Sequence, residues 1–203
     1  MHKMADTFTE ILSFGIHCSK NNGWTFLDAI LKGNEEEGEL AEAILAEFGR
    51  TKKKLKEHYL GEIADNINQV FDLVSHHMDN DTHFKTRHLN NFFSEMFFTE
   101  SKFFDSLFTN TFNRESKDLY EIITSKMMLF NSLKQKVINY PENVSMDVLC
   151  ELVSTVMAIG FILHLNENKI NLLEFKPKHF DKFMEKLQKQ LQKKLAKWQS
   201  KYK

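Results

Sequence analysis

The chain has 203 residues, a formal net charge of −1 and 27% charged residues. Only 7 glycines and 2 prolines occur, whereas ordinary proteins contain about 7% and 5% of these residues. Turn dipeptides that punctuate β-structure are nearly absent. The 19 phenylalanines and the 42% hydrophobic content exclude a disordered chain. The composition therefore predicts an all-α protein with long helices, short connections and a substantial core.

The cysteines and the apolar segments help to predict the cellular compartment of the protein. Cys18 and Cys150 lie in separate apolar segments without CxxC spacing, so we expect two buried thiols rather than a disulfide or a thiolate metal site. The first ten residues lack the basic-then-apolar order of a signal peptide. The longest apolar run, residues 153–165, is interrupted by polar residues and is too short to span a bilayer. We expect a cytoplasmic protein without a membrane partner.

Charge is distributed unevenly along the chain. Residues 1–48 carry three lysines and nine acidic residues, whereas residues 50–56 (RTKKKLK) carry five cations. From residue 176 to the C-terminus, ten lysines accompany two acidic residues. Association with a polyanion responds to the local field rather than to the net charge, so these two segments are candidate nucleic-acid contacts.

Apolar residues at three- and four-residue spacing predict helices throughout the chain. The N-terminal part holds predicted helices through residues 8–16, 26–31 and 36–48, and another that starts at residue 51. Thr25 and Thr51 are the expected N-caps of two of these helices. Residues 32–34 are an expected break, and Gly49 is the expected end of the third helix.

The later predicted helices cover residues 62–77, 89–112, 117–140, 145–165 and 178–198. Pro141 stops the third of these, and Pro177 opens the last one. Eight phenylalanines fall in the segment 89–112, too many for one narrow stripe, so this segment is expected at the centre of the core. The total is eight or nine helices, with no strand.

A candidate helix-turn-helix spans residues 39–59. Two short predicted helices meet there at Gly49, and the second is rich in cations. A DNA-reading pair needs a supporting helix, a sharp turn and a second helix that enters a phosphate-lined groove. The residues expected to contact DNA are Arg50, Thr51, Lys52, Lys53, Lys54, Lys56, His58 and Tyr59. The alternative is a solvated lysine face on an ordinary helical hairpin.

The same segment resembles the helix-turn-helix of the tetracycline-repressor (TetR) family of bacterial transcription regulators. The family pattern is Ile-Ala-x-x-x-Gly-Val-Ser-x-x-x-Leu-Tyr-x-(Tyr or His)-Phe. Its Ile, Gly, Ser, Leu, Tyr-or-His and closing aromatic positions are matched by Ile44, Gly49, Thr51, Leu55, His58 and Tyr59. Arg50 and Lys56 depart from its Val and from the Tyr that directly follows its Leu. The family's first helix has two possible counterparts, residues 11–24 and 26–34.

The resemblance implies a DNA-binding domain at residues 1–61 and a ligand-binding and dimerisation domain at residues 62–203. It implies a repressor that binds a double-stranded DNA operator as a homodimer through the helices at 145–165 and 178–198. A small hydrophobic ligand would bind in an apolar pocket and weaken operator binding. The pocket residues implied are Phe92, Phe93, Phe97, Phe103, Phe104, Met127 and Phe130. The alternative for each of these is plain core packing.

No strong catalytic motif occurs. Histidines at 76, 77, 83 and 88 lie near three acidic residues, but their spacing fits none of the common helical metal motifs, and an exposed polar loop is the simpler interpretation. We expect no catalytic residue, metal or cofactor. The main alternative to a DNA-binding regulator is a helical ligand-binding or protein-interaction module without DNA binding. A metal-dependent helical enzyme is a third hypothesis.

Overall fold

The computed structural model describes residues 2–21, 23–53, 55, 57–77, 87, 91, 118–172 and 174–201. These residues form six α-helices and one short 3₁₀ helix, and no strand. The prediction of an all-α protein is confirmed. Within the described residues the number of α-helices is lower than the eight or nine predicted.

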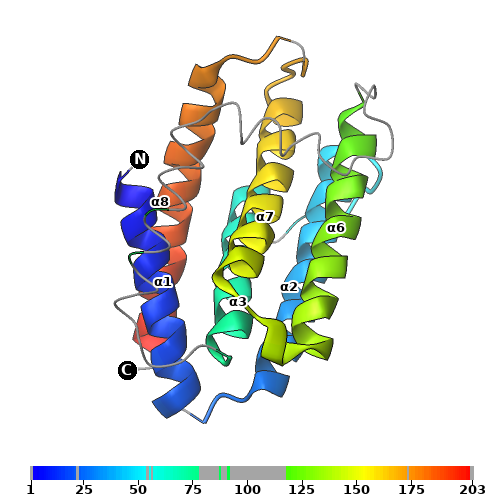
Figure 1. Cartoon of the computed structure of the whole chain (residues 1–203). Coiled ribbons are helices and arrows are strands. Elements are labelled where there is room, and N and C mark those ends of the chain that lie inside the picture. The colour runs from blue at the N-terminus through cyan, green and yellow to red at the C-terminus, as the bar shows by residue number, and fades with distance from the viewer. Residues whose placement is uncertain are drawn as a thin grey trace.

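The helices form a bundle with α3 and α7 between two outer pairs (Figure 1). In chain order they are α1 (His2–Asn21), α2 (Phe26–Glu47), α3 (Tyr59–Ser75), α6 (Leu119–Asn139), η1 (Pro141–Asn143), α7 (Met146–Glu167) and α8 (Pro177–Lys201). Helices α1 and α8 lie together on one side, and α2 and α6 lie on the other. Helix α3 contacts α1, α2, α7 and α8, so it is the element on which the bundle is assembled.

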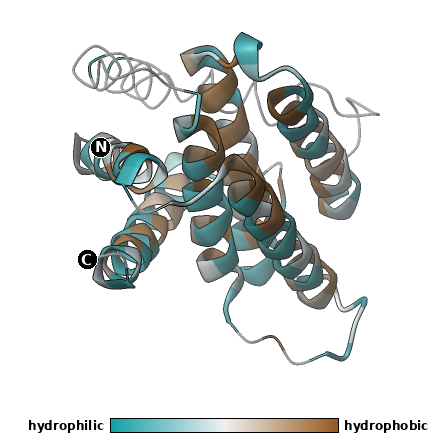
Figure 2. Ribbon diagram, turned by 90° about the horizontal axis from the view of Figure 1, so that it is seen from below, coloured by the Kyte–Doolittle hydropathy of each residue, from teal (hydrophilic) through white to brown (hydrophobic). Residues whose placement is uncertain are grey.

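Helix α7 forms the centre of the core. Fifteen of its 22 residues are buried, and in Figure 2 the hydrophobic residues gather toward the middle of the bundle, where Figure 1 places α7. A helix that is apolar on all sides must be enclosed by other elements, and α3, α6 and α8 pack around it. Among the described residues, α7 is also the one helix long and apolar enough to cross a bilayer, yet it is mostly covered by its neighbours.

Helix α2 is continuous where two helices and a break were expected. Thr25 is its N-cap, and its hydroxyl accepts a hydrogen bond from Asp28 N in a capping box, as predicted for this position. The expected break at residues 32–34 is wrong, because the helix continues to Glu47. Gly33 is buried. A Cβ added at this position would lie 3.5 Å from Nζ of Lys134 on α6. Packing against α3, together with the contacts of Lys134 from α6, therefore overrides the low helix propensity of Gly33.

The prediction of a second helix in the helix-turn-helix segment is also wrong for the described residues. Arg50 to Lys53, Leu55, Glu57 and His58 are not helical, and α3 begins only at Tyr59. The Thr51 hydroxyl accepts a hydrogen bond from Lys53 N in a local turn, and the His58 side chain caps α3 by accepting from Leu60 N. The cationic segment is therefore a connection between α2 and α3.

The later helix boundaries follow the predictions. Helix α6 ends at Asn139 before Pro141, and α7 starts after Ser145, whose hydroxyl accepts from Val148 N. Both cysteines are buried thiols that do not pair with each other, as expected. The buried core extends from Met4 to Leu195, and the predicted domain boundary at residue 61 falls inside α3. The predicted helix at 89–112 lies outside the described residues, apart from Asn91.

Candidate functional site

The cationic segment between α2 and α3 has most of its described side chains engaged within the chain. The Arg50 guanidinium lies 4.9 Å from the centre of the Tyr120 ring, and Lys53 pairs with Glu42 on α2. Lys52 is exposed. Lys54 and Lys56 lie outside the described residues. The structure therefore brings these cations to the surface in a connection rather than on one face of a helix.

His58 and Tyr59, also predicted to contact DNA, are held by α7. The Tyr59 hydroxyl donates to Glu167 Oε2 at 2.9 Å, and His58 Nε2 lies 2.9 Å from Glu167 Oε1. Tyr59 is only 2% exposed. Burial, together with the hydrogen bond to Glu167, raises the pKa of Tyr59 above its ordinary range. The two residues join the start of α3 to the end of α7.

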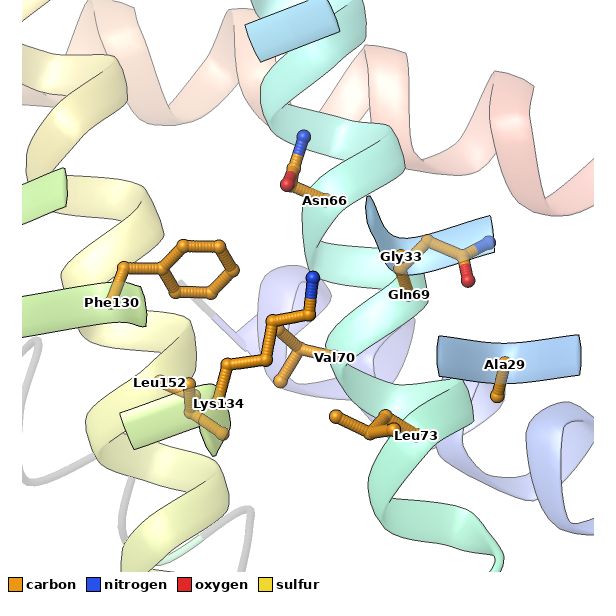
Figure 3. Close-up of a pocket in the computed structure, with 9 residues that line it drawn as sticks. All are labelled: Ala29, Gly33, Asn66, Gln69, Val70, Leu73, Phe130, Lys134 and Leu152. Carbon is orange, nitrogen blue, oxygen red and sulfur yellow. The ribbon is translucent and has the colours of Figure 1, made fainter. Parts of the chain in front are cut away.

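Two of the seven residues predicted to line an apolar ligand pocket are described. Phe130 is buried and Met127 is half-buried against the core. Phe130 borders a cavity of about 10 Å³ beside Ala29, Gly33, Val70 and Leu73, among others (Figure 3). Such a volume holds about one water molecule. Phe92, Phe93, Phe97, Phe103 and Phe104 lie outside the described residues.

The buried Lys134 side chain extends into the same cavity (Figure 3). Its ammonium donates to Asn34 Oδ1 at 2.8 Å and to Glu37 Oε2 at 2.9 Å, both on α2. A buried charge is tolerated when it is paired and hydrogen-bonded. Lys134 therefore joins α6 to α2, and this cavity is part of the packing between them.

A larger recess of about 250 Å³ lies between α2, α3 and α8. It is lined by Trp24, Lys32, Glu36, Asp65, Asn68, Gln69, Asp72, Lys194, Lys197, Trp198 and Lys201. These include both tryptophans of the chain. Ligand sites combine aromatic surface with a few convergent polar groups in a concave place, and this recess meets that description.

One end of the recess carries acceptor oxygens of α3. Trp24 Nε1 donates to Asp72 Oδ2 at 2.8 Å, while the other oxygen of this 1% exposed carboxyl has no partner among the described residues. Asn68 Oδ1 and Gln69 Oε1 are buried and likewise unpartnered there. Burial raises the pKa of Asp72 to about 6, against the lowering effect of the Trp24 hydrogen bond.

A cluster of three carboxylates lies at the other end, and two of its members, Glu36 and Asp65, line the recess. Glu36 of α2 and Glu62 and Asp65 of α3 each offer an oxygen, and the three oxygens all lie within 4.8 Å of one another. Lys32 Nζ pairs with Glu36 Oε1 at 2.6 Å. Lys194 of α8 pairs with Asp65 and with Glu57 Oε2, the latter at 2.6 Å.

Two carboxyls of this cluster are poor acids. Burial is the main cause that raises the pKa of Glu62 to about 7, and the negative charges of Glu39, Asp65 and Glu57 add to it. Burial also raises the pKa of Asp65 to about 6, because it outweighs the favourable pairing with Lys194. Displaced carboxyl pKa values in a recess are a general mark of functional sites.

The sequence interpretation missed the residues of this recess. Helix α3 was recognised from its apolar positions alone, yet 15 of its 17 residues are buried. The signal that was available is the run of polar residues at positions 62, 65, 66, 68, 69 and 72 in a helix with apolar neighbours at nearly every turn. Buried polar residues need partners, so such a helix is a place to look for a site.

No protein-family model, curated protein or solved structure matches this chain. The likeness to the TetR family and the homodimer stay predictions. The helices expected to form the dimer are α7 and α8, and α7 is already enclosed within a single chain.

Proposed function

We propose that this protein is a helical binding module that holds a small molecule with a protonated amine in the recess between α2, α3 and α8. The proposal depends mainly on one observation: buried acceptors of α3, above all Asp72 Oδ1, have no donor in the described part of the chain. A buried acceptor without a donor costs about 1–3 kcal/mol. A ligand that supplies donors removes this cost.

The arrangement of the acceptors suits an ammonium group. Asp72 lies three positions after Gln69 and four after Asn68 on α3, so its side chain neighbours both of theirs on the helix surface. An ammonium group has three donors and no acceptor, and it carries the charge that a buried carboxylate needs. A cation also interacts favourably with an indole face, which Trp24 and Trp198 provide in the recess.

The lysines of the recess narrow the ligand class. Lys32 and Lys194 are paired with carboxylates, and Lys197 and Lys201 on the following turns of α8 also line the recess. These positive side chains oppose a ligand whose only charge is an amine and attract one that also has an acidic group. We therefore expect a small zwitterion, such as an amino acid, to bind better than a simple amine.

Intrinsic fluorescence tests the proposal directly, because the only two tryptophans of the chain line the recess. The full chain is titrated with 4-aminobutyrate, butylamine and butyrate, which share a carbon skeleton. We expect saturable quenching or a spectral shift that is strongest with 4-aminobutyrate, weaker with butylamine and absent with butyrate. A broader panel of amino acids then identifies the preferred side chain.

Variants separate binding in the recess from a general effect. Asp72→Asn should weaken 4-aminobutyrate binding about tenfold or more, because a hydrogen bond to a charged group contributes about 1.5–3 kcal/mol. Asp181→Asn, at an exposed position on α8, should leave it unchanged. If no amine in the panel gives a saturable change with folded protein, the proposal is wrong.

The DNA-binding regulator stays a prediction. Its support is the cluster of five cations at residues 50–56 and the exposure of Lys52. The recess is preferred as the site because buried acceptors there have no donor among the described residues, whereas Arg50 and Lys53 have partners within the chain.

A further inference from the structure

The carboxylate cluster at the other end of the recess is a separate feature. We propose that Glu36, Glu62 and Asp65 together bind one divalent metal ion of the hard, oxygen-preferring class, such as Mg²⁺, Mn²⁺ or Ca²⁺. This site does not depend on the amine site at Asp72. Asp65 and Asp72 are seven positions apart on α3, which corresponds to about 10 Å along a helix axis.

The geometry of the three carboxylates fits one ion. The three offered oxygens lie within 4.8 Å of one another. Metal–oxygen distances are about 2.0–2.1 Å for Mg²⁺ and about 2.3–2.6 Å for Ca²⁺, so two oxygens on the same ion lie at most about 4–5 Å apart. Glu62 and Asp65 are three positions apart on α3 and share a face, and Glu36 approaches them from α2.

Two of these carboxylates are buried without a full set of partners. Glu36 and Glu62 are 6% and 5% exposed, and Oε2 of each has no hydrogen-bond donor among the residues described. Lys32 occupies only Oε1 of Glu36. In the described part of the chain, Glu62 forms no salt bridge to a lysine. A buried carboxylate in this state is strongly unfavourable unless a cation or a proton joins it.

The local charge favours a cation. Counted over the described residues in direct ionic contact or in the cluster, Glu35, Glu36, Glu57, Glu62 and Asp65 face Lys32 and Lys194. Five carboxylates against two ammonium groups leave an excess of three negative charges when all are ionised. One divalent cation reduces that excess to one without displacing either lysine.

A buried asparagine side chain holds two members of the cluster in place through their backbone carbonyl groups. Asn66 is buried, and its Nδ2 donates to the carbonyl oxygens of both Glu36 and Glu62, each at 2.9 Å. One side chain therefore ties the two helices together at the level of two of the proposed ligands. A site supported in this way keeps its ligands near the binding geometry before the ion arrives, which favours affinity.

The chemistry of the ligands selects the class of metal. All three are carboxylates, and no histidine or cysteine joins the described group. Carboxylate oxygens suit Mg²⁺, Ca²⁺ and Mn²⁺, whereas zinc and copper sites usually include nitrogen or sulfur ligands. Glu36 and Asp65 line the recess, which leaves room for bound water to complete the coordination, as Mg²⁺ and Mn²⁺ commonly require.

Mn²⁺ binding to the full chain tests the proposal. The electron paramagnetic resonance signal of free Mn²⁺ falls as the ion binds, so a titration gives the stoichiometry and the affinity. We expect one Mn²⁺ per chain and competition by Mg²⁺ or Ca²⁺. Glu62→Gln should weaken Mn²⁺ at least about tenfold, because affinity follows the ligand charge. Glu185→Gln, on the solvent face of α8 with its side chain 68% exposed, should leave Mn²⁺ binding unchanged.

Further measurements distinguish the possible outcomes. Circular dichroism establishes that Glu62→Gln is folded, and Mn²⁺ should raise the melting temperature of the native protein but not of this variant. Absence of Mn²⁺ binding up to millimolar concentration, or equal affinity in the native protein and Glu62→Gln, would overturn the metal site. Titration with 4-aminobutyrate is scored separately by fluorescence, so either site can fail while the other stands.

Discussion

Asp72 gives the folding stability a pH dependence of known sign. Its pKa is raised to about 6 by burial, whereas an unfolded chain has a value near 3.9. The folded state therefore keeps this proton over a pH range in which the unfolded state has lost it. The stabilisation from the protonated form is complete below about pH 4 and is lost as the pH rises to about 6. Over this range the free energy of unfolding falls by at most about 1.4 kcal/mol per pH unit.

Asp72→Asn isolates this effect, because an amide oxygen can still accept the hydrogen bond from Trp24. In urea unfolding between pH 4 and pH 7.5, we expect the variant to gain stability relative to the native protein as the pH rises to about 6. Above that pH the difference should be constant. A difference that does not change over the acidic range would show that Asp72 is ionised in the folded protein throughout.

Two glycines in helices allow a test of helix packing, because one is closely surrounded and the other is not. A Cβ on Gly160 of α7 would lie 3.1 Å from Ile63 and from Phe183, whereas a Cβ on Gly38 of α2 would meet nothing within 4 Å. Gly160→Ala should destabilise the protein by about 1–3 kcal/mol through overpacking. Gly38→Ala should stabilise it by about 0.5–1 kcal/mol, because alanine favours the helix. Urea unfolding at neutral pH measures both; equal effects would contradict the close contact of α3, α7 and α8.

At the scale of elements, local chemistry made some helix ends predictable and tertiary contacts decided the others. Thr25 and Ser145 cap helices through their own hydroxyls, and such signals are visible in the sequence. The continuity of α2 through Gly33 depends on packing against α3 and on Lys134 of α6, a hundred residues away. The start of α3 at Tyr59 depends on contacts with Glu167. Neither long-range contact has a local signal.

The recess could not be predicted for the same reason. It joins residues 24–36, 65–72 and 194–201, whose proximity depends on how α2, α3 and α8 pack. The sequence did indicate that lysines dominate the last helix, but not that Lys194 turns inward to Asp65 and Glu57. Helical periodicity predicts which face of a helix is apolar and buried. It does not predict that a polar residue is buried on that face, because this depends on a partner from another helix.

The connection between α2 and α3 makes the DNA-binding hypothesis testable. Fluorescence anisotropy with a mixed pool of duplex DNA at two salt concentrations compares the native protein with a variant carrying Ala at lysines 52, 53, 54 and 56. A DNA-binding protein should lose affinity steeply with salt, since each phosphate contact releases counterions. Because the described part of this segment is not helical, we expect weak binding at low salt only, with no preference for sequence. Tight, sequence-selective binding that the variant loses would instead support the regulator.

At the scale of the whole molecule, the enclosure of α7 predicts where the fold is most stable. Fifteen buried residues pack it against α3, α6 and α8, so its amide hydrogens should exchange only through global unfolding. Helix α1 contacts α3 and α8 on one side, and its amides should exchange through local opening at lower free energy.

Hydrogen exchange followed by mass spectrometry measures this order. In native protein, peptides from α7 should be the slowest, with an opening free energy equal to that of urea unfolding, and peptides from α1 should be faster. In Gly160→Ala the opening free energy of α7 should fall by the same amount as the free energy of global unfolding. The reason is that exchange in α7 requires unfolding of the whole bundle. The protection of α1 should change less, since its local opening leaves the contact of Gly160 with Phe183 intact. Exchange of α7 at the rate of α1 would mean that the central helix is not enclosed in solution.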